Sequence, residues 1–184
     1  MKMVFTAMLL AGLITAGCSQ EPKSAAGHVV KIQLTSAAFA DGQPVPVKYT
    51  ADALDISPPL AWVDAPAGTK SFALIADDPD APAGDWMHWV IYDLPPTTAA
   101  LAEDTLKVPQ LPNGAKQGLN DFKKTGYNGP APPPGKAHRY YFKLYALDAM
   151  TGLPPGATRA DLLKVMGGHV LGEGKLMGTY QRQQ

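Results

Sequence analysis

The chain has only one cysteine, Cys18, among its 184 residues, and no excess of charge of either sign. A single thiol forms no disulfide within the chain, so the fold must rest on the burial of side chains alone. The 16 basic and 16 acidic side chains balance, and no block of like charge interrupts the sequence. General nucleic-acid binding needs a basic stripe, so we expect no nucleic-acid partner.

Several catalytic signatures are also absent. The sequence has no Gly-x-Ser-x-Gly elbow, no His-Glu-x-x-His and no phosphate-binding P-loop. Cys18 lies in the leader segment, which excludes cysteine catalysis. What the chain has in quantity is proline and glycine, 18 of each, and these predict many turns and few long helices.

The first 18 residues have the features of an export signal. Lys2 supplies the positive end, Val4–Ile14 is an apolar run too short for a permanent membrane span, and small residues lead to Cys18. The segment resembles a lipobox, whose cysteine is lipidated after cleavage, although Thr15 stands where leucine is usual. The alternative is an ordinary secretory signal cut near the same place, which leaves a soluble protein with a free thiol.

On this interpretation the chain divides into a lipoprotein signal peptide (1–17), a polar tether (18–28) and one domain (29–184). The domain is long enough to enclose a real core. We expect a bacterial cell-envelope protein, anchored to a membrane through lipidated Cys18 and facing the periplasm or the exterior. The alternative location is secreted or periplasmic and soluble.

Four segments have the pattern of β-strands. Val29–Leu34 alternates apolar and polar residues, as a half-buried strand does. Ser71–Ala76 and Trp86–Tyr92 are apolar at both parities, which predicts burial on both faces. Arg139–Leu147 is rich in aromatic and long apolar side chains and is the strongest strand signal.

One helix is predicted over Arg159–Met166. Thr158 stands at the N-cap with Asp161 three residues on, and Gly167-Gly168 ends the segment. Several strands and one late helix favour an all-β sandwich with a small helical appendage. The connection between the last two strands holds eight proline and five glycine residues over 93–138. We expect part of this long connection to lie against the body of the domain and form a rim.

Polar residues gather at the predicted strand ends. Asp78 and Asp80 follow a buried strand, where prolines fix the direction of the chain. His88 shares the parity of Trp86 and Val90, and in the last of the four strands His138 and Tyr140 share the parity of Phe142. These histidines should therefore point inward and need a partner for each ring nitrogen, which the two aspartates can provide. The combination predicts a binding pocket.

The order of these motifs resembles the phosphatidylethanolamine-binding protein family, and more narrowly its bacterial YbhB/YbcL branch, called Raf kinase inhibitor-like. The resemblance rests on Asp77-Asp78-Pro79-Asp80-Ala81-Pro82, His88-Trp89-Val90, Gly126-Tyr127-Asn128-Gly129-Pro130-Ala131-Pro132-Pro133, His138-Arg139-Tyr140, Leu144-Tyr145-Ala146-Leu147-Asp148, Gly168-His169-Val170-Leu171 and Gly178-Thr179-Tyr180-Gln181-Arg182. It covers about Val29–Arg182, essentially the whole domain after the tether.

The resemblance implies a Greek-key β-sandwich of a large and a small antiparallel sheet with a short C-terminal helix. It also implies a small pocket for an anion such as phosphate or a phosphoryl headgroup. Carried over by motif, the pocket is formed by Asp78, Asp80, His88, Pro132, His138 and Tyr140, with Gly129 and Tyr127 at its rim. Asp77 precedes the motif and is expected outside the pocket.

Two carboxylates beside an anion need an explanation. We expect each aspartate to be occupied by turn amides or by a histidine N–H, so that the opposite ring nitrogen or the Tyr140 hydroxyl donates to the ligand. A protonated histidine strengthens this contact. Anion affinity should therefore rise below about pH 6.5, the ordinary pKa of histidine.

Three classes of function remain open. The leading one is a membrane-tethered, non-catalytic binding protein with no cofactor, whose pocket takes a phosphate-like or phospholipid-headgroup anion. The second is an inhibitor or adaptor of an unidentified partner enzyme, for which fold analogy is weak support. The third is a metal-dependent hydrolase, since aspartate and histidine ligate divalent ions.

Overall fold

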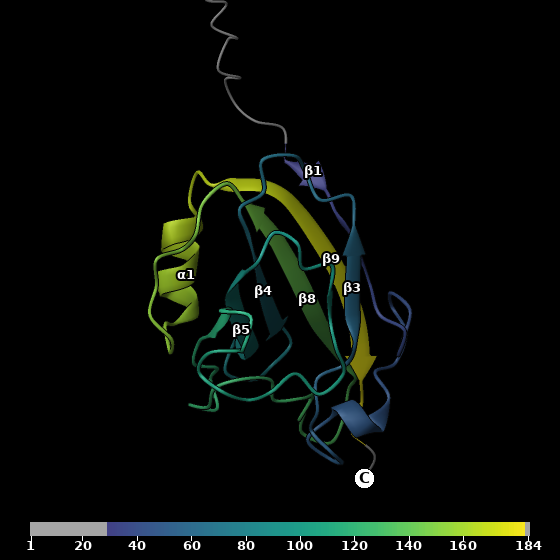
Figure 1. Ribbon diagram of the computed structural model, residues 1–184. Helices are drawn as coiled ribbons and strands as arrows, with labels where there is room; N and C mark the ends of the chain where they lie inside the picture. Colours follow the sequence, from purple (N-terminus) through teal and green to yellow (C-terminus); the bar gives the residue numbers. More distant parts are fainter. Residues whose placement is uncertain (1–28, 183–184) are drawn as a thin grey trace, which may run out of the picture.

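The computed structural model describes residues 29–182 and contains two packed β-sheets with one helix (Figure 1). The leader, Cys18 and the tether lie outside the described residues. The large sheet has the order β1 (Val30–Lys31), β9 (Val170–Tyr180), β8 (His138–Leu147), β4 (Ser71–Asp78), β5 (Trp86–Leu94) and β7 (Lys116–Gln117). The small sheet has the order β2 (Gln33–Thr35), β3 (Leu60–Val63) and β6 (Ala100–Leu101). A short 3-10 turn, η1 (Val47–Tyr49), and the helix α1 (Arg159–Met166) complete the fold.

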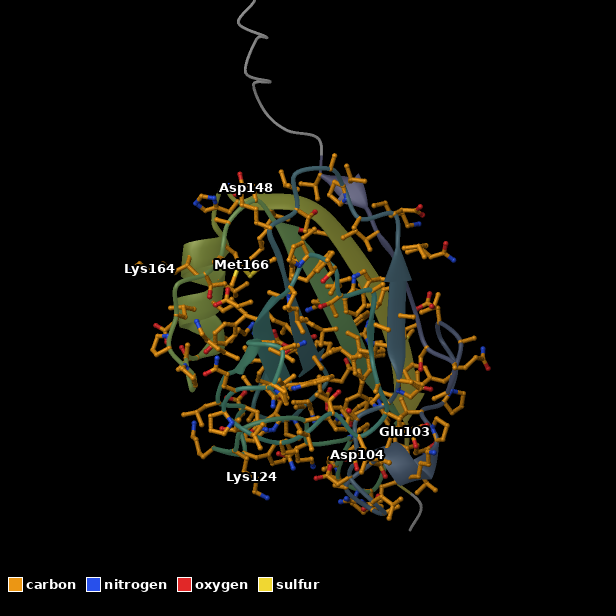
Figure 2. All side chains as sticks on the ribbon, viewed as in Figure 1. Glu103, Asp104, Lys124, Asp148, Lys164 and Met166 are labelled. Atoms are coloured by element: carbon orange, nitrogen blue, oxygen red, sulfur yellow. The ribbon has the colours of Figure 1, made fainter. Side chains whose placement is uncertain are left out.

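The main core lies between the two sheets. Trp62 of the small sheet packs edge-on against Phe72 of the large sheet, with ring centroids 5.4 Å apart. A second apolar cluster lies on the opposite face of the large sheet, under α1. Met166 points from α1 toward the sheet, whereas Lys164 points away from it (Figure 2). Both faces of β4 and β5 are therefore covered, which explains why these strands are apolar at both parities.

The structure confirms the predicted all-β sandwich of a large and a small sheet with a short C-terminal helix. Three predicted strands correspond to β4, β5 and β8, and α1 has the predicted bounds. Thr158 and Asp161 form a reciprocal capping box at its start. The large sheet is antiparallel except where β1 runs parallel to β9. No helix within residues 29–182 is both long enough and apolar enough to cross a membrane.

The first predicted strand, Val29–Leu34, is in fact two strands in different sheets. β1 pairs with β9 of the large sheet, and β2 pairs with β3 of the small sheet. Ile32 lies between them, 1% exposed, and its N–H donates to the Glu173 carbonyl over 2.7 Å. Val30 is 38% exposed rather than inward-facing, because the alternation does not continue through the crossing.

β9 is the longest strand, and the sequence pattern did not predict it. It contains Gly172, Gly174 and Gly178, and glycine normally weakens a strand. Here the chain before the small sheet passes very close: a Cβ on Gly174 would lie 2.9 Å from the Ile32 carbonyl oxygen. The glycines are needed for this close approach.

The large sheet has two ends with different neighbours. Val30 pairs with Gly172 near the start of β9, and His138 pairs with Tyr180 at its end. At about 3.3 Å per residue, these two positions lie about 26 Å apart along the strand. The chain enters the fold at β1, and the starts of β5 and β8 lie at the opposite end (Figure 1).

Candidate functional site

The end of the large sheet farthest from β1 carries a cavity of about 230 Å³. The end of β4, the start of β5, the start of β8 and the long connection before β8 surround it. Its walls are formed by Asp78, Ala81, Pro82, Ala83, Trp86, His88, Phe122, Ala131, Pro132, Pro133 and His138. The cavity is mostly apolar, with one carboxylate and two imidazoles, and part of the proline-rich connection forms its wall.

Asp78 is buried, at 3% exposure, and both of its carboxylate oxygens are occupied. Oδ1 accepts the Asp80 main-chain N–H over 2.9 Å, and Oδ2 accepts from His138 Nδ1 over 2.8 Å. Each oxygen of this wall residue is therefore already held by a donor within the protein.

His138 is the first residue of β8 and is 8% exposed. Because a carboxylate only accepts, the proton between His138 and Asp78 is placed on Nδ1. The opposite ring nitrogen, Nε2, has no hydrogen-bond partner among residues 29–182, and the ring lines the cavity.

His88 is held in the same way by a different acceptor. Its Nδ1 lies 2.7 Å from the Asn128 carbonyl oxygen, so Nδ1 carries the proton. Burial lowers the pKa of His88, while the Asn128 carbonyl and the charge of Asp78 act in the opposite direction. The ring packs edge-on against Phe122 and Tyr140, at centroid distances of 5.3 and 5.2 Å.

A β-bulge sets the direction of His88. Ala76 pairs with Trp89 and Asp77 pairs with Met87, so His88 is the extra residue between them. Val90 consequently packs in the cluster under α1, while His88 faces the side of Tyr140. The prediction that His88 and Val90 share a face is wrong, because the bulge shifts the alternation by one residue.

Tyr140 lies behind the His88 ring and is 3% exposed. Its hydroxyl is buried and has no hydrogen-bond partner within the described part of the chain. Burial raises the pKa of Tyr140, and the nearby charge of Asp78 raises it further. The hydroxyl therefore stays protonated and is a buried donor next to His88, although Tyr140 is not among the residues of the cavity wall.

Asp80 is not in the cavity wall. Its carboxylate takes three hydrogen bonds from Arg139, the closest being 2.7 Å from the guanidinium, and these lower the pKa of Asp80 to about 2. The ion pair between Asp80 and Arg139 connects the loop after β4 to the start of β8. Asp77 faces the opposite side of the sheet, where it pairs with Lys143 and lies near Arg159.

Tyr127 and Gly129, expected at the rim of the pocket, are not among the residues of the cavity wall. Tyr127 is 1% exposed, and its hydroxyl donates to the Tyr49 carbonyl over 2.8 Å. Gly129 is also buried, and its main chain packs against Tyr49 and Thr50. Both residues belong to the support beneath the cavity, because the connection turns into the core before it reaches Pro132.

The sequence pattern predicts that Trp86 is buried as part of the strand Trp86–Tyr92, and it assigns no role to Phe122. The two rings pair edge-on at 5.5 Å and form an apolar wall of the cavity. Trp86 shares parity with His88, and that is the signal that could have found it. Nothing comparable marks Phe122, which comes from the irregular connection.

The metal-dependent hydrolase hypothesis requires metal ligands that converge on one point. Among residues 29–182, no group of three or more His, Cys, Asp or Glu side chains is arranged to hold a metal ion. Asp78 and His138 bond to each other, and Asp80 turns to Arg139.

Fold and site together define a β-sandwich protein with a small histidine-lined cavity at one end. The family model for phosphatidylethanolamine-binding protein matches residues 35–181, and the chain belongs to this family. It is 50% identical over 151 residues to a UPF0098 protein of Methanothermobacter thermautotrophicus, covering 82% of this chain and 99% of that one. A UPF0098 protein of Aquifex aeolicus is 49% identical over 161 residues, covering 86% and 92%.

Two solved structures have the same fold. The phosphatidylethanolamine-binding protein homologue CT736 of Chlamydia trachomatis superposes with a TM-score of 0.76 at 43% identity, covering 83% of this chain and 99% of CT736. YbcL of Escherichia coli, described as a new member of the mammalian family, gives a TM-score of 0.78 at 30% identity, covering 84% and 100%. The predicted family is therefore confirmed.

Proposed function

We propose that the protein is a non-catalytic binding protein whose cavity holds a small phosphate-like anion, free or as a phospholipid headgroup. The observation that carries this proposal is the arrangement of the two imidazoles. His88 and His138 both have Nδ1 fixed by an acceptor, which leaves Nε2 of each ring for a ligand, and both side chains line one cavity.

Such rings bind anions when they are charged. A neutral imidazole with its proton on Nδ1 presents a lone pair at Nε2, whereas an imidazolium presents a donor there. Asp78 is already satisfied by His138 and a turn amide, so it does not compete for these donors. The buried Tyr140 hydroxyl adds a neutral donor beside them.

The cavity size favours a headgroup over a whole lipid. About 230 Å³ is room for several water molecules at about 30 Å³ each, which suits phosphate or phosphoethanolamine and leaves acyl chains outside. The apolar wall of Trp86 and Phe122 suits the carbon atoms of an ethanolamine group.

Anion affinity is expected to rise as the pH falls below about 6.5. Burial lowers the pKa of His88 in the empty protein, and a bound anion favours the charged ring and raises that pKa. Binding therefore takes up a proton, so affinity increases with acidity until the empty protein is itself protonated.

Isothermal titration calorimetry from pH 5 to 8 with phosphate, phosphoethanolamine and sulfate tests the proposal. Sulfate keeps its charge over this range, so the pH dependence of sulfate affinity reports the titration of the protein alone. Binding that does not change with pH would contradict protonated histidine as the anion donor, and absence of binding at any pH would overturn the proposed function.

We also propose that Cys18 anchors the protein to a bacterial membrane. The anchored chain would enter the fold at β1, about 26 Å along the sheet from His138, so the cavity would open away from the anchor. Cys18→Ala is expected to move the protein from the membrane fraction to the soluble fraction of the expressing cells, because it removes the acyl chains. Retention of the variant in the membrane fraction would contradict the anchor.

A further inference from the structure

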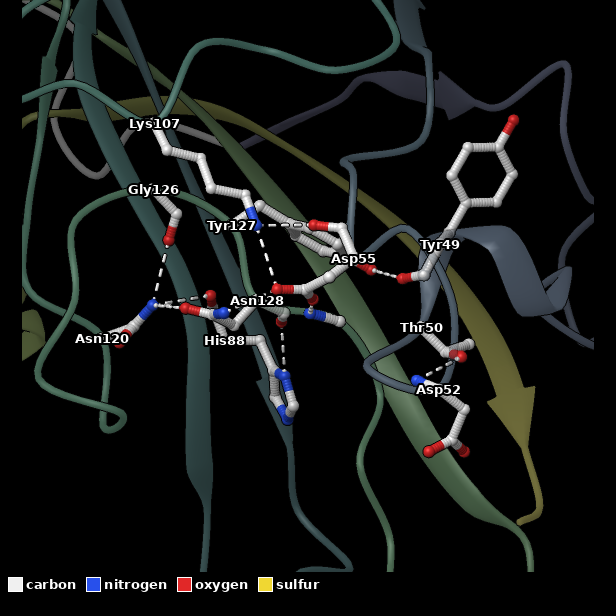
Figure 3. Close-up of polar contacts among 11 residues, drawn as sticks. Tyr49, Thr50, Asp52, Asp55, His88, Lys107, Asn120, Gly126, Tyr127 and Asn128 are labelled. Atoms are coloured by element: carbon white, nitrogen blue, oxygen red, sulfur yellow. Dashed lines mark hydrogen bonds and ion pairs between the residues drawn. The ribbon is translucent and has the colours of Figure 1, made fainter. Parts of the chain in front are cut away.

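His88 is supported from behind by a polar network outside the cavity (Figure 3). Asn128 makes two main-chain contacts with His88: its carbonyl accepts from Nδ1 over 2.7 Å, and its N–H donates to the His88 carbonyl over 3.0 Å. The Asn128 main chain therefore sets both the position of the ring and the nitrogen that carries the proton.

The Asn128 segment is in turn held by Asp55. The Asn128 side-chain amide donates to Asp55 Oδ2 over 2.8 Å, and the Gly129 N–H donates to Oδ1 over 2.6 Å. Asn120 completes the network with a 2.9 Å hydrogen bond to Asn128 Oδ1. Asp55 is far from Asn128 in sequence, and it adopts a left-handed backbone with φ of 55°, which few non-glycine residues do. Such an uncommon conformation is kept only where the surroundings hold it.

Asp55 is not part of the cavity wall. Its charge is balanced by Lys107, whose Nζ lies 3.0 Å from Oδ2 and 2.6 Å from the Asp55 carbonyl oxygen. The Lys107 side chain is 35% exposed, so this ion pair lies at the outer edge of the network. A chain of contacts thus runs from a surface ion pair to a cavity-lining imidazole.

We propose that Asp55 is a positioning residue, which acts through Asn128 and Gly129 to hold His88 with Nδ1 protonated and Nε2 toward the cavity. The effect of Asp55 on anion affinity rests on the proposed function. The effect of Asp55 on the tautomer and pKa of His88 is independent of that function.

Several charged and titratable groups act on His88. Asp78 and His138 line the same cavity as His88, and Tyr140 packs edge-on against the His88 ring. Asp55 and Lys107 lie on the side of Asn128. The charge of Asp55 acts to raise the pKa of His88. A positive charge acts with the opposite sign, so we expect the Lys107 ammonium to oppose the charged imidazole. Removing one or the other should therefore shift the pKa of His88 in opposite directions. If the two substitutions merely loosened the structure around His88, the two pKa shifts would not have opposite signs.

The test uses two substitutions, Asp55→Asn and Lys107→Met. Asp55→Asn keeps the shape of the side chain and removes its charge, and we expect a lower pKa of His88 and phosphate affinity reduced about tenfold, the lower range found when a group that orients a ligating histidine is removed. Lys107→Met is expected to raise the pKa of His88 and, with it, the phosphate affinity. The matched control is Asp52→Asn, in the same loop, whose carboxylate pairs with Arg182 and does not contact Asn128.

The imidazole is followed by nitrogen-detected NMR of ¹⁵N-histidine-labelled protein without added anion, which reports both the tautomer and the pKa. Phosphate affinity is measured separately by calorimetry. An unchanged tautomer and pKa of His88 in Asp55→Asn would overturn the proposal, as would shifts of the same sign in both variants. If the imidazole responds as expected but the parent protein binds no phosphate, the proposed function fails and the positioning role stands.

Discussion

Replacing Gly129 with alanine is expected to lower the free energy of unfolding by about 3 kcal/mol, the upper part of the range for overpacking a close-packed site. A Cβ at this position would overlap the Tyr49 carbonyl oxygen and lie 2.8 Å from Thr50 Cα. Both neighbours are main-chain atoms, so no rotamer change relieves the overlap. The same Tyr49 carbonyl accepts from Tyr127, and the Gly129 N–H donates to Asp55, so a shift strains two further contacts.

Urea denaturation of the parent and the variant measures this effect. Gly167→Ala is the matched control, since its Cβ would meet nothing closer than the Lys164 carbonyl oxygen at 3.4 Å and its φ is −55°. We expect the control to change stability by less than about 0.5 kcal/mol. A loss below about 1 kcal/mol for Gly129→Ala would mean that the η1 segment is free to move away from Gly129.

The parts of the fold that local pattern determines could be predicted from the sequence. β4, β5 and β8 carry continuous or alternating apolar runs, and α1 has a complete capping box. These signals lie within one segment. The glycines of β9 argue locally against a strand, and they are present because another segment of the chain passes close to them. Contacts between segments that are distant in the chain produce no periodic pattern in the sequence.

The same distinction applies to the site. Asp78, His88 and His138 stand at strand ends, where polar residues next to buried strands are conspicuous, and the structure brings them together. The bulge at His88 and the inward turn of Tyr127 could not be predicted, because each depends on which residues pair across strands or pack beneath them. Asp55 was missed for the same reason, since its partners lie in a connection remote in sequence.

The two histidines differ in what fixes them. A neutral carbonyl holds His88, and a carboxylate holds His138. Removing the His88 ring leaves a carbonyl that solvent can satisfy, but removing the His138 ring leaves a buried carboxylate oxygen without its partner at the cavity wall. If the cavity binds an anion as proposed, His138 therefore has a second task, which is to shield that anion from Asp78.

His138→Ala is expected to reduce phosphate affinity by about 100-fold or more at pH 6, equal to about 2.7 kcal/mol or more of binding free energy. The loss combines one missing donor with the repulsion of the newly unpaired Asp78 oxygen. Calorimetry with phosphate measures the effect. The matched control is His169→Ala, because His169 Nδ1 also pairs with an aspartate, Asp148, at 2.7 Å, but its side chain is 49% exposed and outside the cavity wall.

The double variant His138→Ala with Asp78→Asn separates the two causes. Asparagine removes the negative charge while keeping an acceptor for the Asp80 amide, so the double variant should recover part of the lost affinity. Recovery to the level of the parent would mean that His138 acts only as a shield and that His88 and Tyr140 suffice to bind the anion. If His138→Ala binds phosphate as tightly as His169→Ala does, the proposal that the anion binds beside His138 in this cavity is contradicted.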